Sequence, residues 1–206
     1  MKTFDIEDIL FSYPRIFNLI QIIFIPTKVN RMYIDKYVRP KNGDKILDIG
    51  CGPADILEYL PNVEYMGFDM NPRYIQFASQ RYGNRGNFFC QKVNPDVLDN
   101  KMQFDIILAK NILHHLDDNE SNNLFELAYK VLKPGGRLIT YDPCYVTTQS
   151  SISKFIYSLD RGKFIRTAQE YLKIVSQIFS NVTISIEPEI GRFSATVIIM
   201  ECKKYS

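Results

Sequence analysis

A glycine pair that follows a short apolar run is the feature that most constrains this chain. Residues 45–49 read Lys-Ile-Leu-Asp-Ile, and Gly50, Cys51 and Gly52 follow directly. Glycine has no Cβ, so the backbone can turn sharply here and can approach a ligand closely. We expect a helix to begin just beyond, with Pro53 in its first turn. A strand, a glycine turn and a helix start predict a pocket for a nucleotide-like ligand, although a purely structural turn would have the same pattern.

The composition indicates a folded protein of ordinary kind. The 206 residues are 46% hydrophobic and 23% charged, which suits one globular domain with a substantial core. A formal net charge of +2 without a dense basic run argues against a nucleic-acid partner. The four cysteines are scattered and form no Cys-x-x-Cys pair, so we expect no metal site and a reducing, cytoplasmic location.

An apolar N-terminal stretch raises the question of a membrane. Residues 16–25 are strongly apolar but contain Asn18 and Gln21 and are followed by Pro26. This is shorter than the roughly 20 apolar residues that cross a bilayer, and no signal-peptide pattern is present. We therefore expect no transmembrane segment. A helix on a membrane surface stays open as an alternative to packing over the protein's own pocket.

Strand-like runs alternate with helical patterns along most of the chain. This alternation predicts an α/β fold with a Rossmann-like, doubly wound sheet of seven strands and helices on both faces. The last two runs have no helix between them and should pair as a hairpin, so the mostly parallel sheet should have an antiparallel final strand. The expected strands cover 45–49, 65–69, 88–93, 104–108, 137–141, 182–186 and 196–202, and the expected later helices cover 71–83, 124–131, 152–159 and 167–179.

We expect a single domain over residues 1–206 with three parts. Residues 1–40 would form a helical lid, with two helices separated at Pro26. Residues 41–145 would form the cofactor-binding half. Residues 146–206 would supply helices on the acceptor side and the closing strands.

An aspartate at the end of the second strand supports a nucleoside ligand. Asp69 stands where an acidic side chain can accept hydrogen bonds from both ribose hydroxyls. The chief rival ligand is a dinucleotide, whose fingerprint needs a third glycine at position 55. Asp55 stands there instead, and its carboxylate would repel a pyrophosphate.

Five motifs follow one another along the chain, namely Leu47–Gly52, Gly67–Asp69, Phe104–Ile107, Leu113–Leu116 and Leu132–Gly136. Together they resemble the ordered motifs of class I S-adenosylmethionine-dependent methyltransferases, in particular small bacterial members. The resemblance covers about residues 40–145 strongly and the final strands by pattern. It implies a Rossmann-like fold, S-adenosylmethionine as cofactor and S-adenosylhomocysteine as product.

The resemblance also implies a set of cofactor contacts. The glycine turn would surround the methionine part, Asp69 would hold the ribose, and Met70 would pack on the adenine. Asn94 replaces the aspartate that the family often has after the third strand, which leaves the adenine contact open. Ala109 and Lys110 would pass the amino-acid end of the cofactor. The cofactor-binding residues expected are Asp48, Gly50, Cys51, Gly52, Asp69, Met70, Asn94, Ala109 and Lys110.

Three residues are candidates for catalysis. His114 and His115 are the only histidines, and an imidazole after the fourth strand could take a proton from a hydroxyl acceptor near neutral pH. Capping or packing is the structural alternative for both. Asp142, at the expected edge of the pocket, is the third candidate for catalysis. Cys144 follows Pro143 and could suggest a nucleophile, but nothing nearby in the sequence promises a lowered pKa.

The segment after the fifth strand is expected to meet the acceptor. Tyr145, Arg161 and Arg166 are the candidate substrate-binding residues, the two arginines for an anionic group, with a solvated loop as the alternative. We expect methyl transfer to oxygen of a small-molecule or metabolite-like acceptor. The alternatives are an inactive cofactor-binding partner protein and, with less support, a nucleic-acid methyltransferase. The pattern predicts neither the acceptor's identity nor the oligomeric state.

Overall fold

The computed structural model describes residues 27–94, 97–98, 102–147, 149, 163–190 and 195–205. No helix within these ranges is both long enough and apolar enough to cross a membrane. The predicted helices over 16–25 and 152–159 lie outside the described residues.

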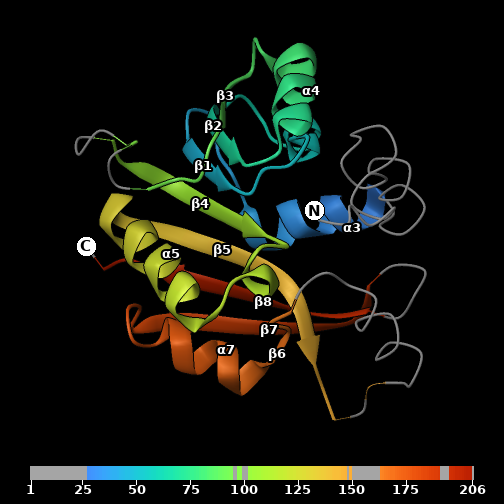
Figure 1. Ribbon diagram of the computed structural model, residues 1–206, viewed down its shortest axis with the longest axis vertical. Helices are drawn as coiled ribbons and strands as arrows, with labels where there is room; N and C mark the ends of the chain where they lie inside the picture. The colour runs from blue at the N-terminus through green and yellow to red at the C-terminus, as the bar shows by residue number, and fades with distance from the viewer. Residues whose placement is uncertain are drawn as a thin grey trace, which may run out of the picture.

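The strands form one sheet in the order β3-β2-β1-β4-β5-β8-β7 (Figure 1). The first five pair in parallel, and β8 runs antiparallel to both of its neighbours. This confirms the predicted fold class, including the antiparallel last strand. A two-residue strand, β6, additionally pairs with the end of β5. The strands are β1 (Lys45–Ile49), β2 (Glu64–Asp69), β3 (Gly86–Cys90), β4 (Phe104–Lys110), β5 (Leu132–Tyr145), β6 (Arg166–Thr167), β7 (Asn181–Ile190) and β8 (Ala195–Lys203).

The strand order reverses beside β1, and this reversal positions the site. The chain proceeds from β1 outward to β2 and β3, then returns to place β4 on the other side of β1. In such sheets a crevice opens at the carboxyl ends of the two strands that flank the reversal. The carboxyl ends of β1 and β4 carry Gly50 and Lys110, which were both expected to contact the cofactor.

Helices cover both faces of the sheet. The helices α5 (Asp118–Val131) and α7 (Ala168–Val175) lie over one face, and both begin with a capping box. On the other face, α3 (Thr27–Met32) continues into the π-helix η1 (Tyr33–Val38), and α4 (Pro72–Tyr82) packs nearby. The predicted start of α4 is confirmed, because the Asn71 side chain accepts from the Arg73 N–H and Pro72 takes the first position.

Three local predictions need correction. The segment after the glycine turn is one turn of 3₁₀-helix, η2 (Asp55–Glu58), because Ala54 adopts a left-handed φ of 58° and Pro61 leaves room for little more. The third strand occupies 86–90 rather than 88–93. The fifth strand, β5, spans 132–145 instead of the predicted 137–141, with a register shift against β4 between Phe104 and Ile106.

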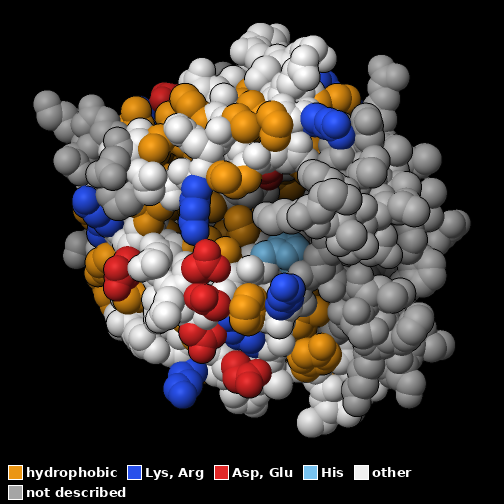
Figure 2. Space-filling model, viewed as in Figure 1, with side chains coloured by type: hydrophobic (Ala, Val, Ile, Leu, Met, Phe, Trp, Pro, Cys, Tyr) orange, Lys and Arg blue, Asp and Glu red, His pale blue; other side chains and the backbone are white. Residues whose placement is uncertain are grey.

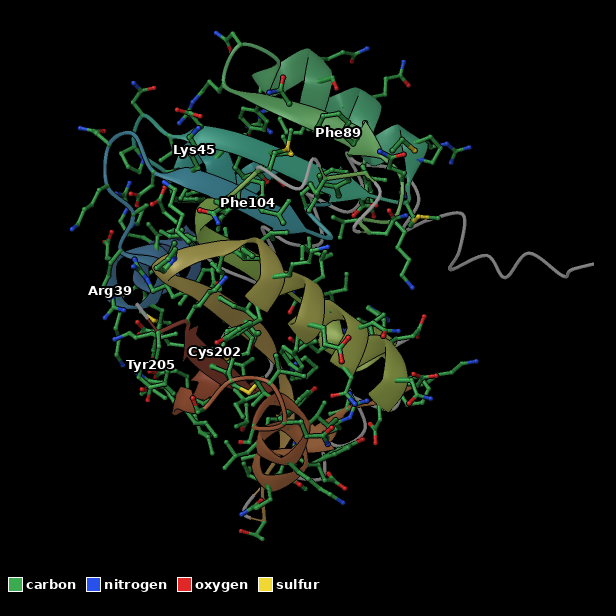
Figure 3. All side chains as sticks on the ribbon, turned by 90° about the vertical axis from the view of Figure 1, so that its left-hand side faces the viewer. Arg39, Lys45, Phe89, Phe104, Cys202 and Tyr205 are labelled. Carbon is green, nitrogen blue, oxygen red and sulfur yellow. The ribbon has the colours of Figure 1, made fainter. Side chains whose placement is uncertain are left out.

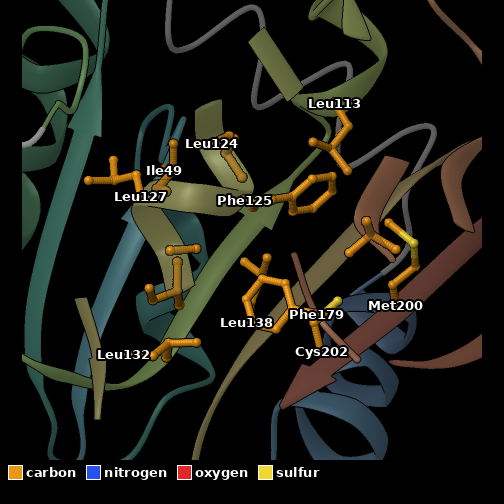
Figure 4. Close-up of a cluster of buried hydrophobic side chains, with 14 of the residues drawn as sticks. Ile49, Leu113, Leu124, Phe125, Leu127, Leu132, Leu138, Phe179, Met200 and Cys202 are labelled. Atoms are coloured by element: carbon orange, nitrogen blue, oxygen red, sulfur yellow. The ribbon is translucent and has the colours of Figure 1, made fainter. Parts of the chain in front are cut away.

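The two faces bury different side chains. The face under α5 and α7, here called the helix-pair face, is filled by aliphatic groups and phenylalanines, including Phe125, Leu138 and Phe179 (Figure 4). The face under η1, here called the tyrosine face, buries five tyrosines. An ion pair ties the end of η1 to β8, with 2.6 Å between Nη2 of Arg39, which is labelled in Figure 3, and Glu201 Oε2. The five tyrosines are Tyr33, Tyr37, Tyr65, Tyr82 and Tyr141.

Candidate cofactor and catalytic site

The glycine turn is held firmly against the end of β2. The N–H groups of Gly50 and Cys51 both donate to the Phe68 carbonyl, at 2.8 and 3.0 Å. Gly50 has a φ of 75°, and a Cβ on it would lie 2.7 Å from Ile112 Cδ1, so a side chain is excluded there. Gly52 has a φ of 54°, and a Cβ on it would meet no atom within 4 Å, which leaves its backbone open to a ligand.

Asp69 joins the turn to the start of α4. Its Oδ2 accepts from the Gly52 N–H at 2.9 Å, and its Oδ1 accepts from the Asn71 N–H at 2.8 Å. Burial raises the pKa of this carboxyl, while the backbone N–H groups partly offset that effect. The carboxylate is thus held in one orientation at the carboxyl end of β2, where ribose recognition was expected.

Asp48 is buried and is held by a tyrosine that was not predicted. The Tyr65 hydroxyl donates to Asp48 Oδ2 at 2.6 Å. Burial raises the pKa of Asp48 to about 6, although the bond from Tyr65 and the charge of Lys110 act in the opposite direction. Gly67 stands opposite Asp48 in the strand register, and a Cβ on Gly67 would lie 2.8 Å from Cys51 Sγ. The missing side chain therefore gives Cys51 its place.

Lys110 ends β4 on the tyrosine face, and Ala109 beside it is fully buried. The Lys110 ammonium donates to Asn30 Oδ1 of α3 at 2.7 Å. It lies 5.8 Å from the ring centroid of Tyr33 and 5.4 Å from that of Tyr141. Burial lowers the pKa of Lys110 to about 8, partly offset by the charges of Asp48 and Asp55. Asn30 and Tyr33 were not predicted as site residues.

The two residues expected near the adenine differ in position. Met70 directly follows Asp69 and is 68% exposed, so its side chain is available to a ring packed against it. Asn94 lies four residues past Cys90, not directly after the strand as predicted, because β3 ends earlier. Its Oδ1 accepts from the Val97 N–H at 3.1 Å. Asn94 as an adenine contact stays a prediction.

His114 and Asp142 form a buried pair across the ends of η3 (Leu113–His115) and β5. His114 Nδ1 lies 2.7 Å from Asp142 Oδ1, and the His114 N–H donates to the same oxygen at 3.2 Å. Burial raises the pKa of Asp142, and these bonds partly offset it. Its Oδ2 is buried and has no hydrogen-bond partner among the residues that the structure describes. With Asp142 ionised, Nδ1–H donates and Nε2 keeps its lone pair.

His115 lies at the surface beside this pair. Its ring centroid is 4.1 Å from that of His114, and its side chain is exposed, whereas His114 is buried. Figure 2 shows the histidine surface in pale blue at the border of a hollow in the molecule. The contact with the Asp142 carboxylate distinguishes His114 as the better candidate for a base.

Arg166 requires a correction, because its side chain is buried and fully used inside the protein. Nε and Nη2 donate to Asp118 Oδ1 at 3.1 and 2.8 Å. The remaining N–H groups donate to the carbonyls of Leu113, Phe164 and Leu116 at 3.1, 3.0 and 2.8 Å. All five guanidinium donors have acceptors, so none is left for an acceptor anion. Arg166 holds the η3 turn in place instead.

The structure provides less information on the other residues that were considered for contact with the acceptor. Arg161 lies outside the described residues. Tyr145 ends β5 with 37% of its surface exposed and stays a prediction. Cys144 is fully buried, and burial raises the pKa of its thiol to about 11, which opposes a role as nucleophile. Among the described residues, no group of three His, Cys, Asp or Glu side chains is arranged to hold a metal ion.

A groove of about 720 Å³ lies elsewhere on the molecule. Its lining includes Lys45, Arg85 and Lys133, at the amino ends of the strands. Lys45 and Lys133 form ion pairs with Glu64 and Asp105. The groove is therefore separate from the glycine turn at the carboxyl ends.

Comparison with known proteins points to one class. Residues 47–138 match the family model described as a methyltransferase domain. The fold around them is that of S-adenosylmethionine-dependent methyltransferases of known structure, which form class I.

Phosphoethanolamine methyltransferases are prominent among the relatives. Phosphoethanolamine N-methyltransferase 3 of Arabidopsis thaliana is 30% identical over 138 residues, which cover 64% of this chain and 27% of that protein. The demethylmenaquinone methyltransferase of Staphylococcus carnosus is 28% identical over 188 residues, which cover 85% of this chain and 68% of that protein. The structure of Haemonchus contortus phosphoethanolamine N-methyltransferase 2 with phosphomonomethylethanolamine and S-adenosylhomocysteine has a TM-score of 0.74 at 15% identity, covering 100% of this chain and 61% of that one. The chain thus spans about a quarter of the Arabidopsis relative's length.

The described residues fit S-adenosylmethionine better than a dinucleotide. A dinucleotide needs a helix N-terminus for its pyrophosphate, whereas the glycine turn here leads into the 3₁₀ turn η2 with Asp55 at its start. The open backbone at Gly52, the fixed Asp69 carboxylate and the buried charges of Asp48 and Lys110 suit a phosphate-free nucleoside with an amino-acid end.

Proposed function

We propose that this chain methylates a hydroxyl oxygen of a small molecule, with His114 as the base and Asp142 as the residue that orients it. The observation that carries the proposal is the buried 2.7 Å contact between His114 Nδ1 and Asp142 Oδ1. S-adenosylmethionine, when bound, supplies a methyl group already activated by its positive sulfur. A hydroxyl is a weak nucleophile until its proton is removed, so an oriented imidazole is useful for oxygen acceptors.

Different residues of the chain would bind the cofactor and remove the proton. Asp48, Asp69, Met70 and the glycine turn would hold the cofactor, with Asp69 accepting hydrogen bonds from the ribose. Asp142 would fix the imidazole in the tautomer with its proton on Nδ1, so that Nε2 carries the lone pair that takes the acceptor's proton, and it would stabilise the imidazolium that forms. The Phe164 N–H donates to the His114 carbonyl at 3.0 Å and holds the main chain of His114 in place.

A small-molecule acceptor is supported by the names of the relatives. They include phosphoethanolamine, demethylmenaquinone and myricetin 3'-O-methyltransferases, so oxygen and nitrogen acceptors both occur among them. The chain has a near-neutral charge, which does not favour a nucleic acid. We extend to this chain the small-molecule class and propose oxygen on the strength of the His114–Asp142 pair.

The test measures methyl transfer from labelled S-adenosylmethionine to a panel of phenols, catechols, aliphatic alcohols and amines. We expect hydroxyl acceptors to be methylated, and His114→Gln to lower kcat by about 10²- to 10⁴-fold with unchanged affinity for S-adenosylhomocysteine. Asp142→Asn should give a smaller loss of kcat and shift the pH profile.

Lys133→Gln is the matched control, because Lys133 pairs with Asp105 far from the site and should leave kcat unchanged. Two results would overturn the proposal. One is methylation of amines alone, and the other is full activity of His114→Gln. Tight S-adenosylhomocysteine binding without transfer to any of the panel would favour the inactive binding protein instead.

A further inference from the structure

One short unit of the chain contacts both elements that carry the His114–Asp142 pair. Arg166 lies in β6, which pairs with the end of β5, and Tyr171 lies in α7, which begins two residues after Arg166. Figure 1 shows that β6 leads directly into α7. Both side chains are buried, with exposed fractions of 6% and 2%. This unit is therefore part of the protein interior beside the pair.

Arg166 holds the turn η3 from both of its ends. Its Nη1 donates to the Leu113 carbonyl at 3.1 Å, and its Nη2 donates to the Leu116 carbonyl at 2.8 Å. These two bonds bracket His114. On another side of the guanidinium, Nη2 also donates to Asp118 Oδ1 at the start of α5, at 2.8 Å. A planar guanidinium with several fixed acceptors has one orientation, so the turn cannot shift without breaking one of these bonds.

Tyr171 holds the end of β5 where the pairing of that strand is interrupted on one side. In the described part of the chain, β5 pairs with β4 as far as Tyr141 and with β6 from Cys144 onward. Asp142 and Pro143 stand between these two ladders, and a proline has no N–H to contribute to either. The Tyr171 hydroxyl donates to the Pro143 carbonyl at 3.1 Å. It thereby fixes the backbone directly after Asp142.

The two side chains also contact each other. The Cζ atom of Arg166 lies 5.6 Å from the centroid of the Tyr171 ring, which is a cation–π distance. The capping box at Thr167 starts α7 between them, so their separation along the chain is set locally. Burial raises the pKa of the Tyr171 hydroxyl and the charge of Asp142 raises it further, which keeps the hydroxyl protonated as a donor.

We propose that Arg166 and Tyr171 are positioning residues, which hold η3 and the end of β5 at the separation at which His114 Nδ1 meets Asp142 Oδ1. The inference rests on the proposed function, because it concerns how the base is held. An imidazole that loses its carboxylate can place its proton on Nε2, and that nitrogen then cannot accept another. A misplacement of about 1 Å at a reacting group can lower a rate by about 10²-fold.

The first test reads the tautomer of His114 by NMR of the full chain with isotope-labelled imidazole nitrogens. Only two histidines contribute signals, and His115→Gln assigns them. At about pH 8, where an imidazole is ordinarily neutral, we expect His114 of the unmodified protein to carry its proton on Nδ1. Tyr171→Phe and Arg166→Lys should each populate the Nε2–H tautomer. Asp142→Asn should populate it most, because its amide can donate to Nδ1.

Kinetics separate this role from a general loss of structure. Tyr171→Phe and Arg166→Lys should each lower kcat by about 10- to 100-fold, while the affinity for S-adenosylhomocysteine changes by less than about twofold. Tyr171→Phe keeps the ring and Arg166→Lys keeps the charge, so both variants should fold. Tyr129→Phe is the matched control, because it removes a hydroxyl from α5 at a residue that is 36% exposed. It should leave the tautomer and kcat unchanged.

The outcomes distinguish this inference from the proposed function. An unchanged tautomer and kcat in both Tyr171→Phe and Arg166→Lys would overturn the inference and leave the assignment of the base standing. An unchanged tautomer with parallel losses of kcat and of S-adenosylhomocysteine affinity would mean a structural role and would also overturn it. A shifted tautomer in a chain that methylates no hydroxyl would support the positioning role and overturn the proposed function. A proton on Nε2 of His114 in the unmodified protein would overturn both.

Discussion

The two faces of the sheet differ in what they bury, and the difference separates stability from ligand binding. The helix-pair face contains one tyrosine, Tyr171, in a cluster of described residues that is otherwise aliphatic, phenylalanine, cysteine and methionine. Among the described residues, the tyrosine face buries five tyrosines, and the side chains of Asp48 and Lys110 lie among them. Tyrosine combines a large apolar ring with a polar tip, so it can line a buried region that also holds charges. One face excludes water, and the other presents polar atoms to the crevice.

The largest expected effect comes from the helix-pair face. Phe125 is 1% exposed and lies at the centre of the cluster in Figure 4. Phe125→Ala should lower the free energy of unfolding by about 3–5 kcal/mol, because it removes a buried ring and leaves a cavity. Urea denaturation measures this. Leu172→Ala on α7, where Leu172 is 38% exposed, is the control and should cost clearly less. If both variants lost the same free energy of unfolding, Phe125 would be no more important to the core than the half-exposed Leu172.

On the tyrosine face, substitution of Asp48 should raise the free energy of unfolding, whereas substitution of Phe125 lowers it. The folded protein keeps the Asp48 proton up to about pH 6, whereas the ordinary pKa of an aspartate is 3.8. The folded state therefore binds more protons between these values, so its unfolding free energy falls as pH rises from about 4 to about 6 and stays lower above. Asp48→Asn should remove this loss and stabilise the ligand-free protein at neutral pH by roughly 3 kcal/mol.

The control for Asp48 is another aspartate with the opposite shift. Lys133 and the Lys45 N–H lower the pKa of Asp105, so Asp105→Asn should not stabilise the protein. Thermal melting at about pH 4.5 and about pH 7 compares the three proteins. If Asp48→Asn is less stable than the parent at neutral pH, the carboxylate is structural rather than kept for a ligand.

Arg166 connects the helix-pair face to the catalytic turn. Arg166→Met should lower the free energy of unfolding by roughly 2–3 kcal/mol, because the carbonyls of Leu113, Phe164 and Leu116 lose their donors. Arg166→Lys should fall between Arg166→Met and the parent. Chemical denaturation measures the loss. A variant of normal stability with a raised acceptor KM alone would restore the substrate-binding role that the structure argues against.

The smallest expected effect is at Thr140 on β5. Its hydroxyl is buried without a hydrogen-bond partner among the residues described, and Thr140 is 0% exposed. Thr140→Val keeps the shape and removes the unsatisfied group, so it should raise the free energy of unfolding by about 1 kcal/mol. Differential scanning calorimetry can resolve this change. Thr140→Ser keeps the hydroxyl and should give no gain, and a loss with valine would show that the hydroxyl has an unrecognised acceptor.

The sheet could be predicted from the sequence because its signals are local. Apolar runs, glycine turns and the Asn71-Pro72 cap each lie within a few residues and decide one element. Tyr65 was within reach of the same reasoning, since β1 and β2 pair in parallel and place it close to Asp48. Asn30 was not, because it meets Lys110 across 80 residues of sequence.

Arg166 shows the limit most clearly. A cluster of positive charges in the sequence favours a solvated loop or an anion site, and both alternatives were wrong for this residue. Its partner Asp118 is 48 residues away, and its other acceptors are backbone carbonyls, which carry no sequence signal at all. Arg166 itself belongs to β6, which pairs with the end of β5.

The π-helix η1 has a consequence for how this chain can vary in length. The Arg39 N–H donates to the Ile34 carbonyl, five residues back, so the turn contains one residue more than an α-helix would have. Deleting a single residue from 33–38 could restore α-helical bonding there. Each residue of an α-helix turns the chain by about 100°, so everything upstream would rotate by about that angle relative to the sheet. Asn30 would then point away from Lys110. The number of residues in this one turn, as much as the identity of residue 30, decides whether an amide oxygen reaches the buried ammonium.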